Sequence, residues 1–489
     1  MALLGAVGAS AFSGRAAPAS SRHVDTPSVT VSLSGASVGP PLPAGFVGLA
    51  TEYWNVEMEV GTDPKKPDAA FEQVLRNLAP GGGFNLRIGG DSTDWTWWPI
   101  AGVKQPPWVR WTMTPTWAAV TDRLVDDLHA HLIVGINMEA GSLQIASAEI
   151  HEIRSAMGAT PTTFELGNEP ELYSHFPFYH GTAGQAVLGR PKAYSMLNMA
   201  TQWNEMANAL PDVRFAGPGY SGLNALPDVG PFLSESRRLS LVTVHTYPLK
   251  STRCTAARPQ EDELFSTHSL QELAAGIGSW TSLAHQNGVG VRVDEMNSVT
   301  CGGQPGFTNT FGPALWALNI LPLYAEAAVN GVNFQSRPYT AQNLIQTVDT
   351  RAGWRVQVQP EYYGLMEFAQ LAPPGSKMLT VGAMPSGLYA WADRTPLGQT
   401  HVVVTNVGTT SVTVAVPAKG ATGPASVETL SGGAGGLWAT GGIRLGGQMI
   451  SPSTGQLTGT PTTKRVPATA RAYDVRVAPA SAAILTFKG

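Results

Sequence analysis

Two glutamates, Glu169 and Glu295, each close a short apolar run, and they are the residues best placed for acid–base chemistry. Glu169 ends the stretch FELGNE, directly after Asn168, and Glu295 ends VRVDE. A buried carboxylate costs several kcal/mol unless it is paired or hydrogen-bonded. Two facing carboxyl groups repel each other's charge, so that one stays protonated while the other ionises. At a separation of about 5–5.5 Å, such a pair suits double-displacement cleavage of a glycosidic bond.

Strands that alternate with helices are predicted to bring these two glutamates together. The strands are expected near residues 46–52, 84–90, 132–139, 162–169, 213–219, 241–248, 291–298 and 331–338, with helical segments between them. This alternation predicts a parallel α/β sheet covered by helices, and eight units predict a closed (β/α)8 TIM barrel. An open doubly wound sheet is the alternative. It would need a Gly-rich turn after its first strand, where this sequence reads GLATEYW.

The sequence predicts further segments on either side of the barrel. Residues 1–27 are small and apolar and resemble a signal peptide without a basic start, a disordered tail being the alternative. Residues 28–45 hold a strand expected to pair with the C-terminal domain, and residues 46–354 form the barrel. Residues 355–489 alternate with period two between Gly, Pro and Thr turns, which predicts an all-β sandwich.

Composition argues against several classes of function. The 489 residues carry a net charge of −4 without a basic run, so nucleic-acid binding is not expected. No later window approaches the ~18 apolar residues of a membrane span. The two cysteines, Cys254 and Cys301, form no C-x-x-C motif, so neither a metal nor another cofactor is expected. With an export signal they predict one disulfide and a secreted or periplasmic protein, expected to be a monomer, although two separate buried thiols remain the alternative.

Polar residues stand at the ends of most predicted strands, where a barrel places its active site. They include Glu52, Asp91, Glu139, Asn168, Glu169, His245, Tyr247, Asp294, Glu295 and Arg337. Glu139 is interpreted as structural, a third carboxylate of the site being the alternative. Asp294 is also interpreted as structural, because strand alternation should point it away from Glu295. His245 fits a core histidine and a site residue equally well. The tryptophans between positions 95 and 117 fit either a sugar-stacking wall or core packing.

Five stretches in order, GLATEYWN, NLRIGGDS, FELGNEPELY, VHTYP and VDEMNS, resemble glycoside hydrolase family 79, the β-glucuronidase and heparanase family. The resemblance covers about residues 30–489 and implies a retaining barrel glycosidase. It implies that Glu169 is the general acid/base and that Glu295 is the nucleophile. It also implies that Asn168 binds the sugar 2-hydroxyl and that Tyr247 donates a hydrogen bond to Glu295. Two further residues, Glu52 and Asp91, would hold sugar hydroxyls away from the leaving group.

The loop after the proposed nucleophile, SVTCGG, departs from the family pattern. Thr300 stands where bacterial glucuronidases of the family carry a tyrosine that binds the sugar carboxylate. The backbone of Gly302, and the side chains of Tyr339 and Arg337, are candidates to replace it. Cys301 lies in this loop, so a bridge to Cys254 would hold the pocket wall.

The predicted substrate is therefore a β-D-glucuronide, a carbohydrate cleaved at its non-reducing end. A neutral or modified β-hexoside is the alternative on the same barrel, because of Thr300. A carbohydrate-binding protein without catalysis is the alternative of a different class. The intact pair of glutamates argues against that last reading.

Overall fold

The computed structural model describes residues 29–488 except 419 and 470, and its centre is a closed barrel of eight parallel strands. Around the barrel the order is β11 (Phe215–Tyr220), β12 (Leu239–Thr246), β14 (Gly290–Met296), β16 (Val332–Ser336), β3 (Val47–Glu52), β4 (Asn85–Gly89), β7 (His131–Ile136) and β8 (Thr162–Leu166). The predicted (β/α)8 barrel is thus confirmed. The predicted leader, residues 1–27, lies outside the described residues.

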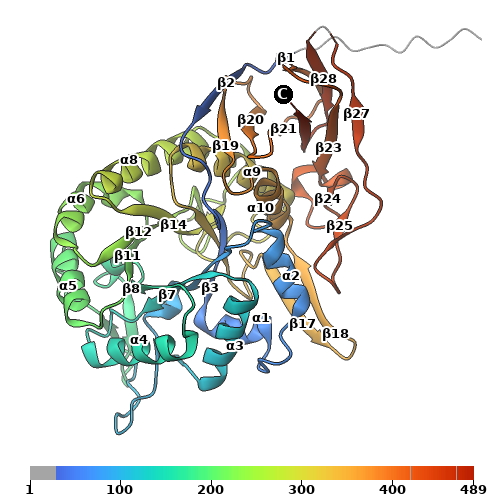
Figure 1. Cartoon of the computed structure of the whole chain (residues 1–489). Helices are drawn as coiled ribbons and strands as arrows, with labels where there is room; N and C mark the ends of the chain where they lie inside the picture. The colour runs from blue at the N-terminus through green and yellow to red at the C-terminus, as the bar shows by residue number, and fades with distance from the viewer. Residues whose placement is uncertain (1–28, 419, 470, 489) are drawn as a thin grey trace, which may run out of the picture.

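Helices surround the barrel on its outer side (Figure 1). They are α1 (Val56–Val60), α2 (Ala69–Asn77), α3 (Pro115–Asp127), α4 (Leu143–Met157), α5 (Met196–Ala209), α6 (Leu226–Glu235), α7 (Glu261–Leu264), α8 (Leu273–Gln286), α9 (Phe311–Glu326) and α10 (Pro360–Leu371). Side-chain caps fix several starts: Asp68 accepts from two backbone N–H groups of α2, and Ser142 accepts from Ile145 of α4. No helix in the described part of the chain has the length and apolar character needed to cross a membrane.

Two β-sheets stack beside the barrel and form a sandwich. The larger has the order β2 (Leu33–Val38), β19 (Lys377–Val381), β20 (Leu388–Arg394), β21 (Gln399–Asn406), β29 (Ser481–Lys488), β23 (Ala425–Ser431) and β24 (Arg444–Leu445), with β27 (Lys464–Val466) on β23. The smaller has the order β1 (Val29–Thr30), β22 (Val412–Pro417) and β28 (Ala472–Val477). The N-terminal strands β1 and β2 therefore pair with strands from the C-terminal part of the chain.

The larger sheet is buried on both faces. Val402 and Leu485 point into the core shared with the smaller sheet, next to Val475. Their neighbours Val403 and Ile484 belong to the core that continues into the barrel. Successive strand residues alternate between the two faces, and the run Val402–Val404 in the middle of β21 is accordingly apolar on both faces. The sandwich and barrel are consequently joined by a continuous apolar contact, which lies beside α9 and α10 (Figure 1).

The residues just after position 355 are not all-β. The hairpin of β17 (Ile345–Thr350) and β18 (Gly353–Val358) leads into helix α10, and the β-sheets begin only at β19. Tyr362 of α10 donates a hydrogen bond to the backbone of Val74 in α2, so this helix is part of the barrel wall. The sequence pattern missed α10 because most of its residues are buried, which leaves no polar face to reveal a helical period.

Several loops contain short pairs of strands. They are β5 (Thr96–Trp97) with β6 (Trp111–Thr112), β9 (Pro177–His180) with β10 (Ala186–Leu188), β13 (Leu249–Lys250) with β15 (Val299–Thr300), and β25 (Met449–Ile450) with β26 (Leu457–Thr458). The first three pairs belong to loops that follow barrel strands, so they build the rim above the carboxyl ends of the barrel. This rim is where side chains can be presented to a ligand.

Candidate active site

A cavity of about 650 Å³ opens at the carboxyl ends of the barrel strands. It is lined by nine of the residues predicted for catalysis or binding: Glu52, Asp91, Asn168, Glu169, Tyr247, Glu295, Thr300, Gly302 and Arg337. Tyr339 does not line it. Its side chain is 83% exposed, stacks on Trp54 and borders a separate hollow, so the proposal that Tyr339 binds the sugar carboxylate is corrected.

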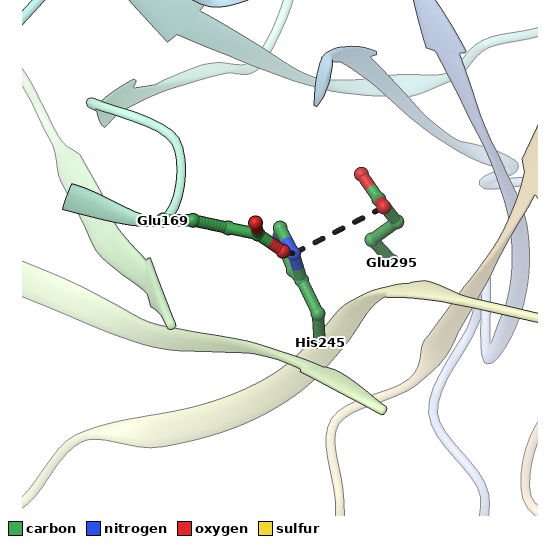
Figure 2. A group of neighbouring side chains, drawn as sticks. All are labelled: Glu169, His245 and Glu295. Atoms are coloured by element: carbon green, nitrogen blue, oxygen red, sulfur yellow. Dashed lines mark hydrogen bonds and ion pairs between the residues drawn. The ribbon is translucent and has the colours of Figure 1, made fainter. Parts of the chain in front are cut away.

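Glu169 and Glu295 face each other across this cavity. Figure 2 shows the two carboxyl groups approaching from opposite sides of His245. One oxygen of each glutamate and one ring nitrogen of His245 all lie within 4.8 Å of one another. Glu169 has a left-handed backbone conformation with φ of 47°, held by a hydrogen bond from its N–H to Gly219. Such a conformation is uncommon outside glycine and needs support from its surroundings.

Glu295 is held as a carboxylate. Arg87 Nη1 donates to its Oε2 at 2.8 Å, and Tyr247 Oη donates to its Oε1 at 2.7 Å. Burial alone acts to raise the pKa of Glu295. The positive charges of His245 and Arg87 and the Tyr247 hydrogen bond outweigh burial, and the pKa ends below its usual value.

The pKa of Glu169 is shifted in the opposite direction, above its usual value. Burial raises its pKa, the charge of Glu295 adds to the rise, and the bond to His245 offsets only part of it. His245 Nδ1 lies 2.8 Å from Glu169 Oε1. Burial acts to lower the pKa of His245, but the carboxylates around it, Glu295 first, raise it to about 10. His245 is therefore a cation at neutral pH, and the pKa values of the two glutamates are shifted in opposite directions.

A group of buried charged side chains, centred on Arg87, contacts Glu295 from the barrel interior. Arg87 is inaccessible to solvent and also contacts Glu165 at 2.8 Å and Asp294 at 3.4 Å. Its Nη2 donates to Asn168 Oδ1, which leaves the amide nitrogen of Asn168 as the atom able to donate to a ligand. Arg87 thus fixes the orientation of both a carboxylate and an amide at the cavity floor.

The prediction that Asp294 points away from Glu295 is wrong. Both side chains reach Arg87, at 3.4 and 2.8 Å. Strand β14 shifts register against β12, so that Val293 pairs with Val244 and Glu295 with His245, leaving Asp294 as an extra residue. A β-bulge of this kind breaks the alternation of faces on which the prediction rested.

One end of the cavity is lined by a second cluster of charged side chains, formed by Arg337, Asp91 and Glu52. Arg337 pairs with Asp91 at 2.7 Å and approaches Glu52 at 3.7 Å. Ser92 donates its backbone N–H to Glu52 at 2.9 Å. Burial, only partly offset by Arg337, raises the pKa of Glu52 to about 7. Glu52 and Asp91 offer oxygens to hydroxyl donors here, while Arg337 is already engaged.

A wall of two loops closes another side. Thr300, Cys301 and Gly302 face the cavity beside Arg253 and Cys254. Cys254 and Cys301 form a disulfide, as the sequence predicts, with their Cα atoms 6.4 Å apart. Strands β13 and β15 pair just before it, so the loops after β12 and β14 are tied together twice.

The remaining wall is aromatic. Trp95 lines the cavity with the Arg110 guanidinium 4.3 Å from its ring centre, and Phe176 and Phe178 line it from β9 and the loop before it. Trp97 and Trp108 pack with Phe178 in a small core behind this wall. Trp117 belongs to the main core. The tryptophan-rich segment therefore contributes both to the cavity lining and to core packing. Glu139 also lines this side, and burial raises its pKa to about 9.

Glu169, His245 and Glu295 are also the group most able to hold a metal ion among residues 29–488 with described positions. The surrounding charge opposes this. Arg87 already occupies one oxygen of Glu295, and its guanidinium would repel a dication there. Tyr247 occupies the other oxygen. The donor set fits a proton-transfer site better than a metal site.

Three residues of this region have no role that the sequence predicts: Arg87, Glu165 and Arg253. Arg87 and Glu165 were visible as charged residues inside the apolar strands NLRIGG and FELG, where an unpaired charge would be costly. That signal predicts that each has a partner but does not say which one. Arg253 carried no signal beyond its position next to Cys254.

The fold and the site together define a barrel protein with an attached β-sandwich and a facing pair of carboxyl groups in its cavity. No family model matches the chain. The chain is 26% identical over 174 residues to a β-glucuronidase of Aspergillus niger. That match covers 32% of this chain and 30% of the relative, so less than a third of the relative's length is spanned.

Solved structures resemble the chain over nearly its full length. A 4-O-α-L-rhamnosyl-β-D-glucuronidase of Fusarium oxysporum superposes with a TM-score of 0.69 at 17% identity, covering 94% of this chain and 99% of that one. An α-L-arabinofuranosidase of Thermotoga maritima superposes with a TM-score of 0.63 at 16% identity, covering 94% and 99%. At these identities the likeness is one of fold: a (β/α)8 glycosidase barrel with an additional β-domain.

Proposed function

We propose that this protein is a retaining β-glycoside hydrolase in which Glu295 is the nucleophile and Glu169 the general acid/base. One observation carries the proposal: the two carboxyl groups lie close together with opposite pKa shifts. Their nearest oxygens are within 4.8 Å. Retaining enzymes need about 5–5.5 Å between the groups, whereas inverting enzymes need about 6.5–9.5 Å to admit a water molecule.

In the first step, an oxygen of ionised Glu295 attacks the anomeric carbon, and the bond to the leaving oxygen breaks. Glu169 gives its proton to that oxygen, so the leaving group departs as a neutral alcohol. In the second step, Glu169 takes a proton from water, the water oxygen attacks the anomeric carbon, and Glu295 is released. The cationic His245 stabilises the negative charge that Glu169 carries between the two steps.

The substrate we propose is a β-D-glucuronide, and with it membership of glycoside hydrolase family 79. The names of the Aspergillus and Fusarium proteins support this, as does the order of the five sequence motifs. A neutral β-hexoside is the second candidate, favoured by Thr300 at the position of the missing tyrosine. The disulfide between Cys254 and Cys301 supports a location outside the cytoplasm.

Replacing each glutamate tests the two roles. Glu295→Ala and Glu169→Ala should each lower kcat on 4-nitrophenyl β-D-glucuronide by roughly three orders of magnitude or more. Azide should rescue both variants but with opposite stereochemistry: the α-glycosyl azide from the Glu295 variant and the β-glycosyl azide from the Glu169 variant. Glu205→Ala, an exposed glutamate on α5, is the matched control.

Product analysis by proton NMR distinguishes the outcomes. Wild-type rates in either active-site variant would reject the assignment, and the same azide anomer from both would reject the division of roles. A panel of 4-nitrophenyl β-glucuronide, β-glucoside, β-galactoside, β-xyloside and α-arabinofuranoside decides the sugar. Turnover of a neutral sugar without the glucuronide would replace the proposed substrate and leave the glutamates in place.

A further inference from the structure

Three arginines line the cavity, and two of them are already engaged. Arg337 pairs with Asp91, and Arg110 stacks on Trp95 and donates to a backbone carbonyl. The third is Arg253. Within the described part of the chain, no carboxylate pairs with its guanidinium and no group accepts a hydrogen bond from it. An uncompensated cation facing a cavity is a receptor for an anion.

The backbone beneath Arg253 is firmly held. Its own N–H donates to Ser251 Oγ at 3.2 Å, and the next residue, Cys254, is bonded to Cys301. Thr252 donates from its N–H and its hydroxyl to Gln304 at 3.0 Å. The side chain is exposed, but the position from which it reaches into the cavity is fixed by both loops. Less conformational entropy is therefore lost when it binds.

Gly302 is matched to this guanidinium. A Cβ atom at position 302 would lie 3.0 Å from Arg253 Nη1 and 3.3 Å from Thr340, and the backbone φ of 79° also disfavours other residues. Glycine thus leaves room for the guanidinium against the wall. The two residues present a charged, planar donor directly beside the segment in which Thr300 replaces the expected tyrosine.

The ring geometry of a pyranose points its C5 substituent toward this wall. C2 and C5 are opposite atoms of the six-membered ring. Asn168, the proposed partner of the 2-hydroxyl, follows β8, while the wall of Arg253 and Gly302 follows β12 and β14. With C1 between the two glutamates and C2 toward Asn168, a carboxylate on C5 extends away from β8 toward the loops of Arg253.

We infer that Arg253 binds the C5 carboxylate of the glucuronide and so determines specificity for an acidic sugar. The inference rests on the proposed function and names the residue that gives this site its preference. A guanidinium forms charge-assisted, bidentate hydrogen bonds with a carboxylate, whereas a hydroxymethyl group at C5 offers no charge to pair with it.

The test compares two substrates that differ only in charge at C5: 4-nitrophenyl β-D-glucuronide and its methyl ester. Arg253→Gln should lower kcat/KM for the glucuronide by about 10- to 100-fold, chiefly through KM, because a hydrogen-bonded charge partner is lost. Its effect on the methyl ester should stay within about threefold, since no net charge is present to bind. Arg253→Lys should recover part of the loss, because it keeps the charge without the bidentate geometry.

Arg258→Gln is the matched control, an exposed arginine of the same loop that does not line the cavity. Gly302→Ala is a second probe, which should displace the guanidinium and mimic Arg253→Gln. An unchanged kcat/KM for the glucuronide in Arg253→Gln would overturn the inference, as would equal losses on both substrates. Wild-type turnover of the ester but not the glucuronide would overturn it while leaving the glycosidase proposal intact. No wild-type turnover of any glycoside in the panel would overturn both.

Discussion

At the scale of single residues, His245 is the charged group that lies beside both glutamates. It bonds Glu169 at 2.8 Å and lies 4.0 Å from Glu295, and its pKa of about 10 keeps it positive. A positive charge stabilises the ionised form of each carboxyl group, so it lowers both pKa values. The pKa of Glu169 is nevertheless raised, because its burial outweighs this effect.

Removing that charge should move the whole pH profile. Activity is lost on the acid side when Glu295 becomes protonated and on the alkaline side when Glu169 loses its proton. His245→Gln removes the cation, so both pKa values rise and both limbs of the kcat/KM profile should shift to higher pH. Steady-state rates on an aryl glycoside from pH 3 to 9 measure this. Limbs that stay in place, or move to lower pH, would show that His245 is neutral in the wild type.

At the scale of elements, much of the architecture was readable from the sequence. Eight apolar runs separated by helical segments predicted the eight barrel strands, because buried parallel strands and covering helices have different periods and lengths. The polar residues at the strand ends located the cavity. The bulge at Asp294 could not be foreseen, since an inserted residue leaves no mark in a short apolar run.

The site was less predictable where it depends on contacts across the barrel. Tyr339 follows the eighth strand as a pocket residue would, but its loop turns outward onto Trp54. Arg253 lines the cavity from a loop that is disulfide-bonded to the loop after β14. Loop direction and long-range partners are set by tertiary packing, so spacing along the chain does not reveal them.

Removing the disulfide tests whether it holds the loops that carry Arg253 and Gly302 in place. Cys254→Ser with Cys301→Ser opens a loop of 47 residues, which should lower stability by at most ~4 kcal/mol on the chain-entropy account. Because Arg253 is adjacent to the bridge, KM for the glucuronide should rise more than kcat falls. Thermal unfolding and steady-state kinetics measure the two effects, with reduced wild type as the comparison. Unchanged melting and an unchanged KM would mean that the strand pair β13–β15 holds the wall alone.

At the scale of the whole molecule, the larger sheet packs against two hydrophobic cores: one face contacts the sandwich core and the other contacts the core of the barrel. Trp391 of β20 is only 4% exposed and its ring lies 5.5 Å from Phe368 of α10. Trp391→Ala should cost about 3–5 kcal/mol. Since the contact joins sandwich and barrel, the whole protein should unfold at lower urea in one transition, followed by circular dichroism. Trp438→Ala, a half-exposed tryptophan, is the control. Two separate transitions, with only one shifted, would show that the cores unfold independently.

The pairing of the first strands with the last ones also bears on how the chain is made. Val29 pairs with Val414, and Val38 pairs with Met378, so the barrel sequence is synthesised between the two halves of each pair. At roughly 5–20 residues per second, the first strands leave the ribosome tens of seconds before their partners exist. The barrel can close during synthesis, but the sandwich can form only after nearly the entire chain has emerged. Until then, β1 and β2 lack their partner strands and have open edges that can pair with other chains.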